Sequence, residues 1–249
     1  MRETENSLVP SAVWLTAFLD FPAERFERGV AFWRAVTATT LSPPRGEAGE
    51  FATLVPPDGD AFLRVQRLGD GPARVHLDVH RVGQDFAIRR SPGGFVFCEV
   101  HEGESARPKP VAWPGGPAGS RGDSAGSGHT SLVDQVCLDI PAGRFDEECA
   151  FWAGQTGWEV RTGSRPEFRV LARPAGIPLR ILLQRLDEPD GPMRAHLDLA
   201  TTDRAAETRR HQDLGATVHS HGPAWTTLRD PTGLPYCITD RDPGTGLLP

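Results

Sequence analysis

The chain has 249 residues, of which 38% are hydrophobic, and a formal net charge of −6. This length fits two domains of roughly 100–130 residues. The negative charge argues against nucleic acid or an anionic membrane as a partner, because phosphate binding needs a basic surface. No segment has the roughly 18 apolar residues of a membrane-spanning helix, and residues 1–10 contain no hydrophobic signal region. We therefore expect a cytoplasmic protein whose four cysteines stay reduced.

The chain contains two copies of one sequence pattern. FLDFPAERFERGVAFW in the first half matches CLDIPAGRFDEECAFW in the second, and RVQRL and RVHLDV match LLQRL and RAHLDL. In chain order, the matching pairs are residues 18–33 and 137–152, 64–68 and 182–186, and 74–79 and 194–199. Because every block recurs in the same order, the sequence predicts two copies of one domain.

Each copy opens with an apolar run of strand length, followed by a helix. Phe26, Val30 and Trp33 recur at helical spacing, and the same spacing is found in the second copy. We interpret Phe32-Trp33 as core anchors of the helix. Short strands follow, including a hairpin over residues 51–68 that turns at Asp58-Gly59. Up to the HLD segment, each copy reads β-α-β-β-β and then β.

Only the second copy repeats this pattern in full. It continues into a helix that Gly215 ends, and then into three strands separated by turn residues. His196 and Cys237 are 41 residues apart, whereas their counterparts His76 and Cys98 are 22 apart. The first copy therefore lacks a helix and much of a strand. The predicted organisation is an N-terminal domain truncated in its second module over residues 8–101, a Pro/Gly/Ser-rich linker over 102–130 and a complete C-terminal domain over 131–243.

A tandem β-α-β-β-β pattern with AFW late in the helix, QRL, HLDL and DPTGxxYC in this order resembles the vicinal oxygen chelate superfamily. The likeness is closer to the glyoxalase-like domains of bacterial proteins. The resemblance implies an α+β fold, in which tandem βαβββ modules form cupped mixed sheets with the helices outside and the ligand site inside. It also implies a range of activities, from isomerases and dioxygenases to metal-free proteins that only bind a drug, so the fold does not settle the function.

Alternation along the strands predicts which side chains face the cup. Successive residues of a strand point to opposite faces, and in the HLD and QRL segments apolar residues alternate with polar ones. The apolar faces should lie under helices and the polar faces should line the cups. The predicted polar ligand-binding residues are Arg180, Gln184, His196 and Asp198 in the second copy and Arg64, Gln66, His76 and Asp78 in the first. A sheet with one solvated face also carries polar residues without binding anything, and this alternative stays open.

Three further residues complete the predicted site of the second copy. Trp225 and Tyr236 are expected as apolar walls, because pockets for organic molecules are mostly apolar with a few polar anchors. Cys237 is expected as a buried thiol in the same site, since the sequence shows no base or positive group beside it that would make it a nucleophile. No catalytic residue is predicted.

The resemblance also defines where a metal would bind. In metal-dependent members, four positions supply ligands that are typically His and Glu. In this sequence the third position holds His76 or His196, the second Gln66 or Gln184, and the fourth Cys98 or Cys237. The first falls near Trp14 in one copy and at Gln135 or Asp134 in the other. Glutamine is a weak neutral donor where imidazole, carboxylate or thiolate is normal. We therefore expect no metal ligands and no cofactor, with a divalent metal as the alternative.

These observations lead to one main hypothesis and two alternatives. The main hypothesis is a protein without a catalytic metal that binds a small, partly aromatic organic molecule in the second copy's cup. The first alternative is a metal-dependent lyase, isomerase or dioxygenase with an altered ligand set. The second is a structural role for the first copy, whose uncovered sheet edge could pair with the other copy or, in a homodimer, with a second chain.

Overall fold

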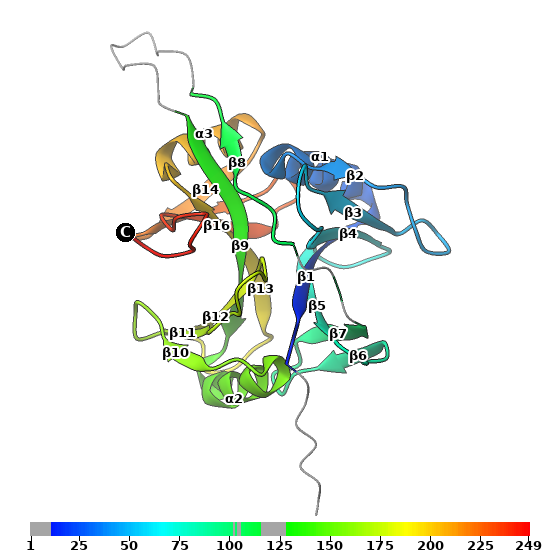
Figure 1. Ribbon diagram of the computed structural model, residues 1–249, viewed down its shortest axis with the longest axis vertical. Helices are drawn as coiled ribbons and strands as arrows, with labels where there is room; N and C mark the ends of the chain where they lie inside the picture. Colours follow the sequence, from blue (N-terminus) through cyan, green and yellow to red (C-terminus); the bar gives the residue numbers. More distant parts are fainter. Residues whose placement is uncertain (1–10, 102, 104–105, 116–127) are drawn as a thin grey trace, which may run out of the picture.

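The computed structural model describes residues 11–101, 103, 106–115 and 128–249. Two mixed β-sheets lie side by side, one formed by each half of the chain (Figure 1). This arrangement confirms the α+β fold with tandem cupped modules. The linker expected over residues 102–130 lies partly outside the described residues. Within those residues, no helix combines the length and apolarity needed to cross a bilayer.

Among its described residues, the first half contains one α-helix, a short 3-10 turn over Ala23–Arg25 and seven strands. They are β1 (Trp14–Pro22), α1 (Phe26–Thr37), β2 (Thr40–Leu41), β3 (Phe51–Val55), β4 (Leu63–Leu68), β5 (Arg74–Arg81), β6 (Ala87–Arg90) and β7 (Val96–His101). Their order across the sheet is β2-β3-β4-β1-β5-β7-β6. Strand β1 pairs in parallel with β4 and antiparallel with β5, so the strand that opens the copy lies at the centre of the sheet.

The second half repeats this plan and extends it. It contains β8 (Val111–Trp113), β9 (His129–Ile140), α2 (Phe145–Thr156), β10 (Val160–Thr162), β11 (Phe168–Leu171), β12 (Arg180–Arg185), β13 (Arg194–Thr201), α3 (Arg204–Asp213), β14 (Thr217–His221), β15 (Trp225–Arg229) and β16 (Pro235–Thr239). The order is β10-β11-β12-β9-β13-β16-β15-β14, with β8 paired to β9. Helix α3 and strand β14 follow β13, whereas residues 82–86, which follow β5, form no helix.

The matched helices end in the same way despite different residues. Helix α1 is followed by Ala38 at φ 51° and helix α2 by Gly157 at φ 69°. This left-handed conformation closes a helix and favours glycine, because a Cβ atom clashes there. The first copy therefore keeps the geometry with a less suitable residue.

The two halves share one hydrophobic core. Helix α1 of the first half reaches β16 of the second, where Trp33 packs edge-on against Tyr236 with ring centroids 5.4 Å apart. Helix α2 reaches β7 in return, with Trp152 and Phe97 centroids 5.1 Å apart. Strands β5 and β13 lie against each other at the centre (Figure 1). The helix-bearing faces of the sheets therefore turn toward each other, and the opposite faces turn outward.

Buried polar contacts also hold each of these helices against the other half of the chain. The indole Nε1 of Trp33 donates to Asp230 at 3.0 Å, across the two halves. Trp152 Nε1 donates to Glu148 at 2.9 Å, and the other oxygen of Glu148 accepts from the backbone of Gly93 in the β6–β7 turn. Helix α1 thus holds the last hairpin of the other half through Trp33, which donates to a carboxylate of that hairpin, and α2 does so through Glu148, which Trp152 orients.

Candidate functional site

The C-terminal half encloses a cavity of about 580 Å³ on its outward face. Its walls come from β9, β10, β11, β12, β13, β15 and β16, together with the tail that follows β16. All lining residues fall between Gln135 and Leu248, so this cup belongs to the second copy alone.

Most of the residues predicted for the second copy line this cavity. Strand β12 contributes Arg180 and Gln184, and β13 contributes His196 and Asp198. Their apolar neighbours Ile181 and Leu197 are fully buried, as strand alternation requires. The cavity lining also includes the predicted residues Trp225 and Cys237.

Tyr236 does not line the cavity, so the expectation that it forms a wall of the cup is wrong. It is fully buried on the other face of β16, between Trp33 and His211, and its hydroxyl is 2.9 Å from His211 Nδ1. Residues 236 and 237 are adjacent on one strand, so their side chains must point to opposite faces. Only Cys237 can face the cup.

His196 lies between two carboxylates. Its Nδ1 is 3.0 Å from Asp139 and its Nε2 is 3.4 Å from Asp198. Burial disfavours the charged ring, but the Asp139 carboxylate beside it, which accepts a hydrogen bond from the ring, outweighs burial. The pKa of His196 is therefore raised well above its usual value. Because a carboxylate only accepts, His196 Nδ1 carries a proton and donates it to Asp139.

Arginines dominate one end of the cavity. Arg241 makes two hydrogen bonds to Asp134, at 3.1 and 2.6 Å, and lies 3.9 Å from Asp198. Arg180 donates to the carbonyl of Gly246 in the C-terminal tail, and Arg173 to that of Pro178. These contacts position three guanidinium groups around the polar face.

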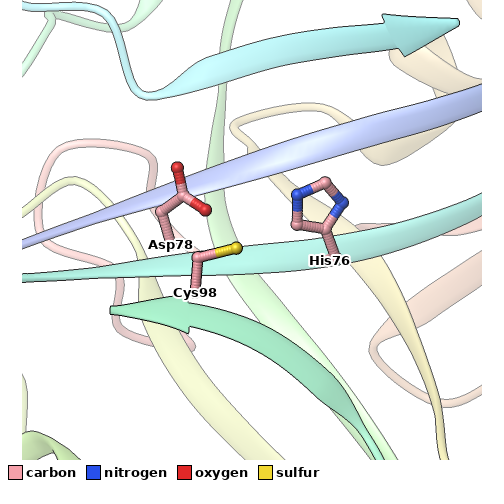
Figure 2. A group of neighbouring side chains, drawn as sticks. All are labelled: His76, Asp78 and Cys98. Carbon is pink, nitrogen blue, oxygen red and sulfur yellow. The ribbon is translucent and has the colours of Figure 1, made fainter. Parts of the chain in front are cut away.

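The first copy carries a matching cluster on its own outward face. His76 and Asp78 project from β5 and Cys98 from β7, and one potential ligand atom of each lies within 4.8 Å of the others (Figure 2). His76 Nδ1 is 2.9 Å from Asp20, as His196 is paired with Asp139. Phe18 stacks on His76 with centroids 4.5 Å apart, where the second copy has Cys137. The aromatic ring thus fills space that the second cup leaves to a smaller side chain.

The two other residues predicted for the first copy lie near this cluster. Arg64 comes within 3.9 Å of Asp78 and 5.8 Å of the Phe18 ring. Gln66 lies on β4, two residues from Arg64 and therefore on the same face of the strand. Both copies place Gln, His and Asp at matching positions, whereas Arg64 matches Leu182 and Arg180 lies two residues earlier on β12.

The second cup does not fit a divalent ion of the kind held by metal-dependent superfamily members. Cys137, Asp139 and His196, and likewise His196, Asp198 and Cys237, have suitable atoms within 4.8 Å. However, the pKa of His196 is raised, so a proton competes for its lone pair. Burial raises the pKa of Cys137, which keeps its thiol neutral. Gln135 donates to Asp198, and Arg241 lies beside the same oxygen. These features suit an anion better than a cation.

The first cup is a closer match to a metal site. Its imidazole, carboxylate and thiol are donor types that zinc accepts, and Arg64 is the cation near Asp78. Burial raises the pKa of Asp78 and raises that of Cys98 to about 12. The Cys98 thiol would have to lose its proton on binding an ion, so metal affinity would depend on pH.

Several residues of the second cup were missed in the sequence. Asp139 and its counterpart Asp20 stand in the longest repeated block, and β-strand alternation from Cys137 would have placed Asp139 on the cup face. Arg173 lies in a loop, and residues 245–248 in the tail, where no periodicity indicates a direction. Of the two positions left open for the first metal ligand, Gln135 lines the cavity, whereas Asp134 pairs with Arg241. Trp14 belongs to the core.

Comparison with known proteins agrees with this architecture. The family described as Glyoxalase-like domain matches residues 16–93 and 135–239, one segment in each half. No curated protein matches the chain. The Mn(II)-bound glyoxalase from Novosphingobium aromaticivorans is 14% identical, with a TM-score of 0.60 over 97% of this chain and 87% of the other.

Two dioxygenase structures show the same fold. The extradiol ring-cleaving dioxygenase from B. fuscum is 12% identical, with a TM-score of 0.58 over 95% of this chain and 74% of the other. The 2,3-dioxygenase LapB from Pseudomonas sp. KL28 is also 12% identical, with a TM-score of 0.57 over 92% of each chain. At these identities the similarity establishes the fold and leaves the chemistry to the site.

Proposed function

Because this chain belongs to the family of glyoxalase-like domains, whose fold carries many activities, we propose that its C-terminal cup binds a small organic ligand without the help of a metal. The observation that carries this proposal is the cavity of about 580 Å³, which combines a polar face with an aromatic wall. Cavities of this size and composition suit ligands of drug-like dimensions.

The polar face supplies directed hydrogen-bond donors. The hydrogen bond between His196 Nδ1 and Asp139 fixes the direction of the ring, and Nε2, 3.4 Å from Asp198, is the nitrogen left for a ligand. Gln184 accepts from Cys137 Sγ at 3.4 Å, which orients its amide at the cavity wall. Arg180 adds a planar set of donors on the same strand. Fixed donors in a half-enclosed cavity bind with little loss of side-chain entropy.

The test is calorimetric titration against a metabolite library, with His196→Ala as the variant. We expect at least one ligand whose affinity falls tenfold or more in His196→Ala, because a hydrogen bond to a charged group is worth about 1.5–3 kcal/mol. The matched control is His76→Ala, which makes the same change at the corresponding position of the first copy. The proposal would be contradicted if no member of the library bound, or if a ligand of the cup bound His196→Ala with unchanged affinity.

A metal-dependent enzyme is the second candidate function. It is favoured by the first copy's cluster, in which His76, Asp78 and Cys98 could act together as ligands (Figure 2). A divalent ion there would supply a Lewis acid or a bound hydroxide for lyase, isomerase or dioxygenase chemistry. Elemental analysis of protein purified without chelator separates the two candidates. Near-stoichiometric iron, nickel, zinc or manganese that is lost in Cys98→Ser would support the enzyme.

A structural role of the first copy is the third candidate. It is supported by the packing of α1 against β16, where Trp33 covers Tyr236. The outer edge of β6 ends the first sheet, whereas the corresponding β15 is paired with β14. Ile88 on this edge strand and Phe86 before it are 65% and 69% exposed. A homodimer joined at this edge would appear as a doubled mass in light scattering, and Ile88→Lys would return it to a monomer.

A further inference from the structure

The charge of the second cup is opposite to that of the whole chain. Although the protein has a formal net charge of −6, arginine is the most frequent charged residue in the cavity lining. Among the described residues that line it, Asp198 is the only acidic one. The lining arginines are Arg161, Arg173, Arg180 and Arg241. A concave surface with one sign of charge concentrates ligands of the opposite sign.

Two of these arginines have no carboxylate partner within 4.0 Å in the described part of the chain. Arg173 and Arg180 each donate to one backbone carbonyl, whereas Arg241 is held by Asp134 and Arg161 by Glu159. A guanidinium group carries five N–H donors. Most donors of Arg173 and Arg180 are therefore left for a ligand.

The two unpaired guanidinium groups converge on one place. A Cβ atom built on Gly246 would lie 3.3 Å from Arg180 Nη1 and 3.7 Å from Arg173 Nη2. Asp134 Oδ2 lies 3.5 Å from the same point, but this carboxylate is hydrogen-bonded to Arg241 and offsets only part of the positive charge. Both groups are partly buried, and like charges so close repel each other. Burial, with the nearby Arg107, Arg180 and Arg241, lowers the pKa of Arg173 to about 10, so the group still carries its charge at neutral pH. An anion at this place would relieve the repulsion and use the free donors.

The opposite part of the lining is apolar and aromatic. Phe168 and Trp225 meet edge to face with ring centroids 6.2 Å apart, and Leu171, Leu182 and Leu247 also line the cavity. Aromatic side chains bind flat apolar molecules through large contact areas. The cup therefore combines an anion-binding end with a wall for an apolar body.

We propose that the ligand of the C-terminal cup is an organic anion, whose carboxylate or phosphoryl group is bound by Arg173 and Arg180 and whose aromatic body packs against Phe168 and Trp225. This inference rests on the proposed binding function and narrows its ligand class. A bidentate guanidinium contact to an oxyanion is geometrically matched and about twice as strong as a neutral hydrogen bond.

The test uses matched aromatic acids and their neutral amides on the full chain. Benzoate with benzamide, phenylacetate with phenylacetamide, and phenyl phosphate are titrated by ligand-observed NMR and calorimetry. We expect the acids to bind at least tenfold more tightly than their amides, with an affinity that falls as sodium chloride is raised. Phenyl phosphate compared with the carboxylates tells which oxyanion the cup prefers.

Variants assign this preference to the two arginines. Arg180→Gln and Arg173→Gln should each weaken acid binding tenfold or more and weaken amide binding much less, so that the preference for acids over amides falls. Arg180→Lys should recover part of the preference, because it restores the charge without the planar donors. Arg185→Gln is the matched control, since Arg185 is exposed on the same strand with its side chain on the other face. Thermal unfolding of each variant shows that it is folded.

The outcomes separate this inference from the function on which it rests. The anion assignment is wrong if amides and other neutral molecules bind the cup as tightly as acids do. It is also wrong if the affinity for acids is the same in both glutamine variants and at all salt concentrations. In either case the cup remains a binding site. If no member of the metabolite library binds at all, the binding function itself is refuted.

Discussion

The buried contact between Trp33 and Asp230 makes a quantitative prediction about how the two halves stabilise each other. Trp33→Phe keeps an aromatic ring but removes the N–H that donates to Asp230 at 3.0 Å. Losing a hydrogen bond to a charged group costs about 1.5–3 kcal/mol. The lost pyrrole part of a fully buried ring adds about 1 kcal/mol. We therefore expect the free energy of unfolding to fall by about 2.5–4 kcal/mol.

Urea denaturation monitored by far-ultraviolet circular dichroism measures this change. Because the core is shared, we expect one cooperative transition, with the whole curve shifted in Trp33→Phe. Trp225→Phe is the control: it makes the same chemical change at a partly exposed tryptophan and should cost less than about 1 kcal/mol. Asp230→Asn in a double-mutant cycle should show a coupling energy of at least about 1 kcal/mol. A zero coupling energy, or two separate transitions, would refute the reasoning.

Three further predictions follow from local geometry. A fragment of residues 129–249 lacks α1, whose Trp33 packs on Tyr236 in the full chain. Gel filtration of this fragment should therefore show aggregated or expanded protein. A native monomer that binds ligand would contradict the shared core. Ala38→Gly should stabilise the chain by about 0.5 kcal/mol in thermal unfolding, because Ala38 is at φ 51°, and Gly157→Ala should destabilise it. Burial, with Arg64 nearby, lowers the pKa of His80 from 6.5 to about 4. The folded protein therefore resists protonation of this ring, and its free energy of unfolding should fall by about 3 kcal/mol as the pH falls from 6.5 to 4. Urea denaturation at several pH values measures this loss, which should be absent in His80→Gln.

The sequence predicted the strands and the direction of their side chains because both are local properties. Strand alternation depends only on the period of two, and it correctly placed Gln184, His196 and Asp198 on the cup face. The repeat strengthened each assignment, since the same pattern had to hold twice. The same rule also excludes Tyr236 from the face that holds Cys237, and that prediction failed because aromatic character was given more weight than alternation.

The rest of the site depends on contacts between distant segments. The tail that contributes Gly246 and Leu247 follows the last strand and folds back over the cavity, held by Arg180. Arg173 lies in a loop whose direction is fixed by a bond to Pro178. A register shift in the β9–β13 pairing separates the roles of Asp134 and Gln135. None of these features has a periodic signal, because each is set by tertiary packing.

Helix α1 packs on the sheet of the second half, and α2 packs on the sheet of the first. This packing explains how the sheet of the first copy is covered although that copy lacks one helix and one strand. In the second copy, the helix-covered face of β16 carries Tyr236 and Ile238 beneath α1 and α3. In the first copy, α2 covers Phe97 at the position that matches Tyr236. The position that matches Ile238 holds Glu99. An apolar side chain at this position would have to be buried by the helix that the first copy lacks, whereas a carboxylate does not.

Glu99 in turn is neutralised from both sides. It accepts from Arg89 at 2.7 Å and pairs with the fully buried Arg81, whose guanidinium also donates to Gln155 Oε1 on α2 at 2.7 Å. A buried ion pair is stable only when it is hydrogen-bonded. Here Arg81 and Arg89 hold Glu99 within its own half, and Gln155 of the neighbouring half accepts from Arg81. The truncated copy therefore replaces an apolar contact with its own helix by a charged contact with its neighbour's helix. This replacement makes the two halves a single folding unit, and it leaves the outward face of the second copy free to bind a ligand.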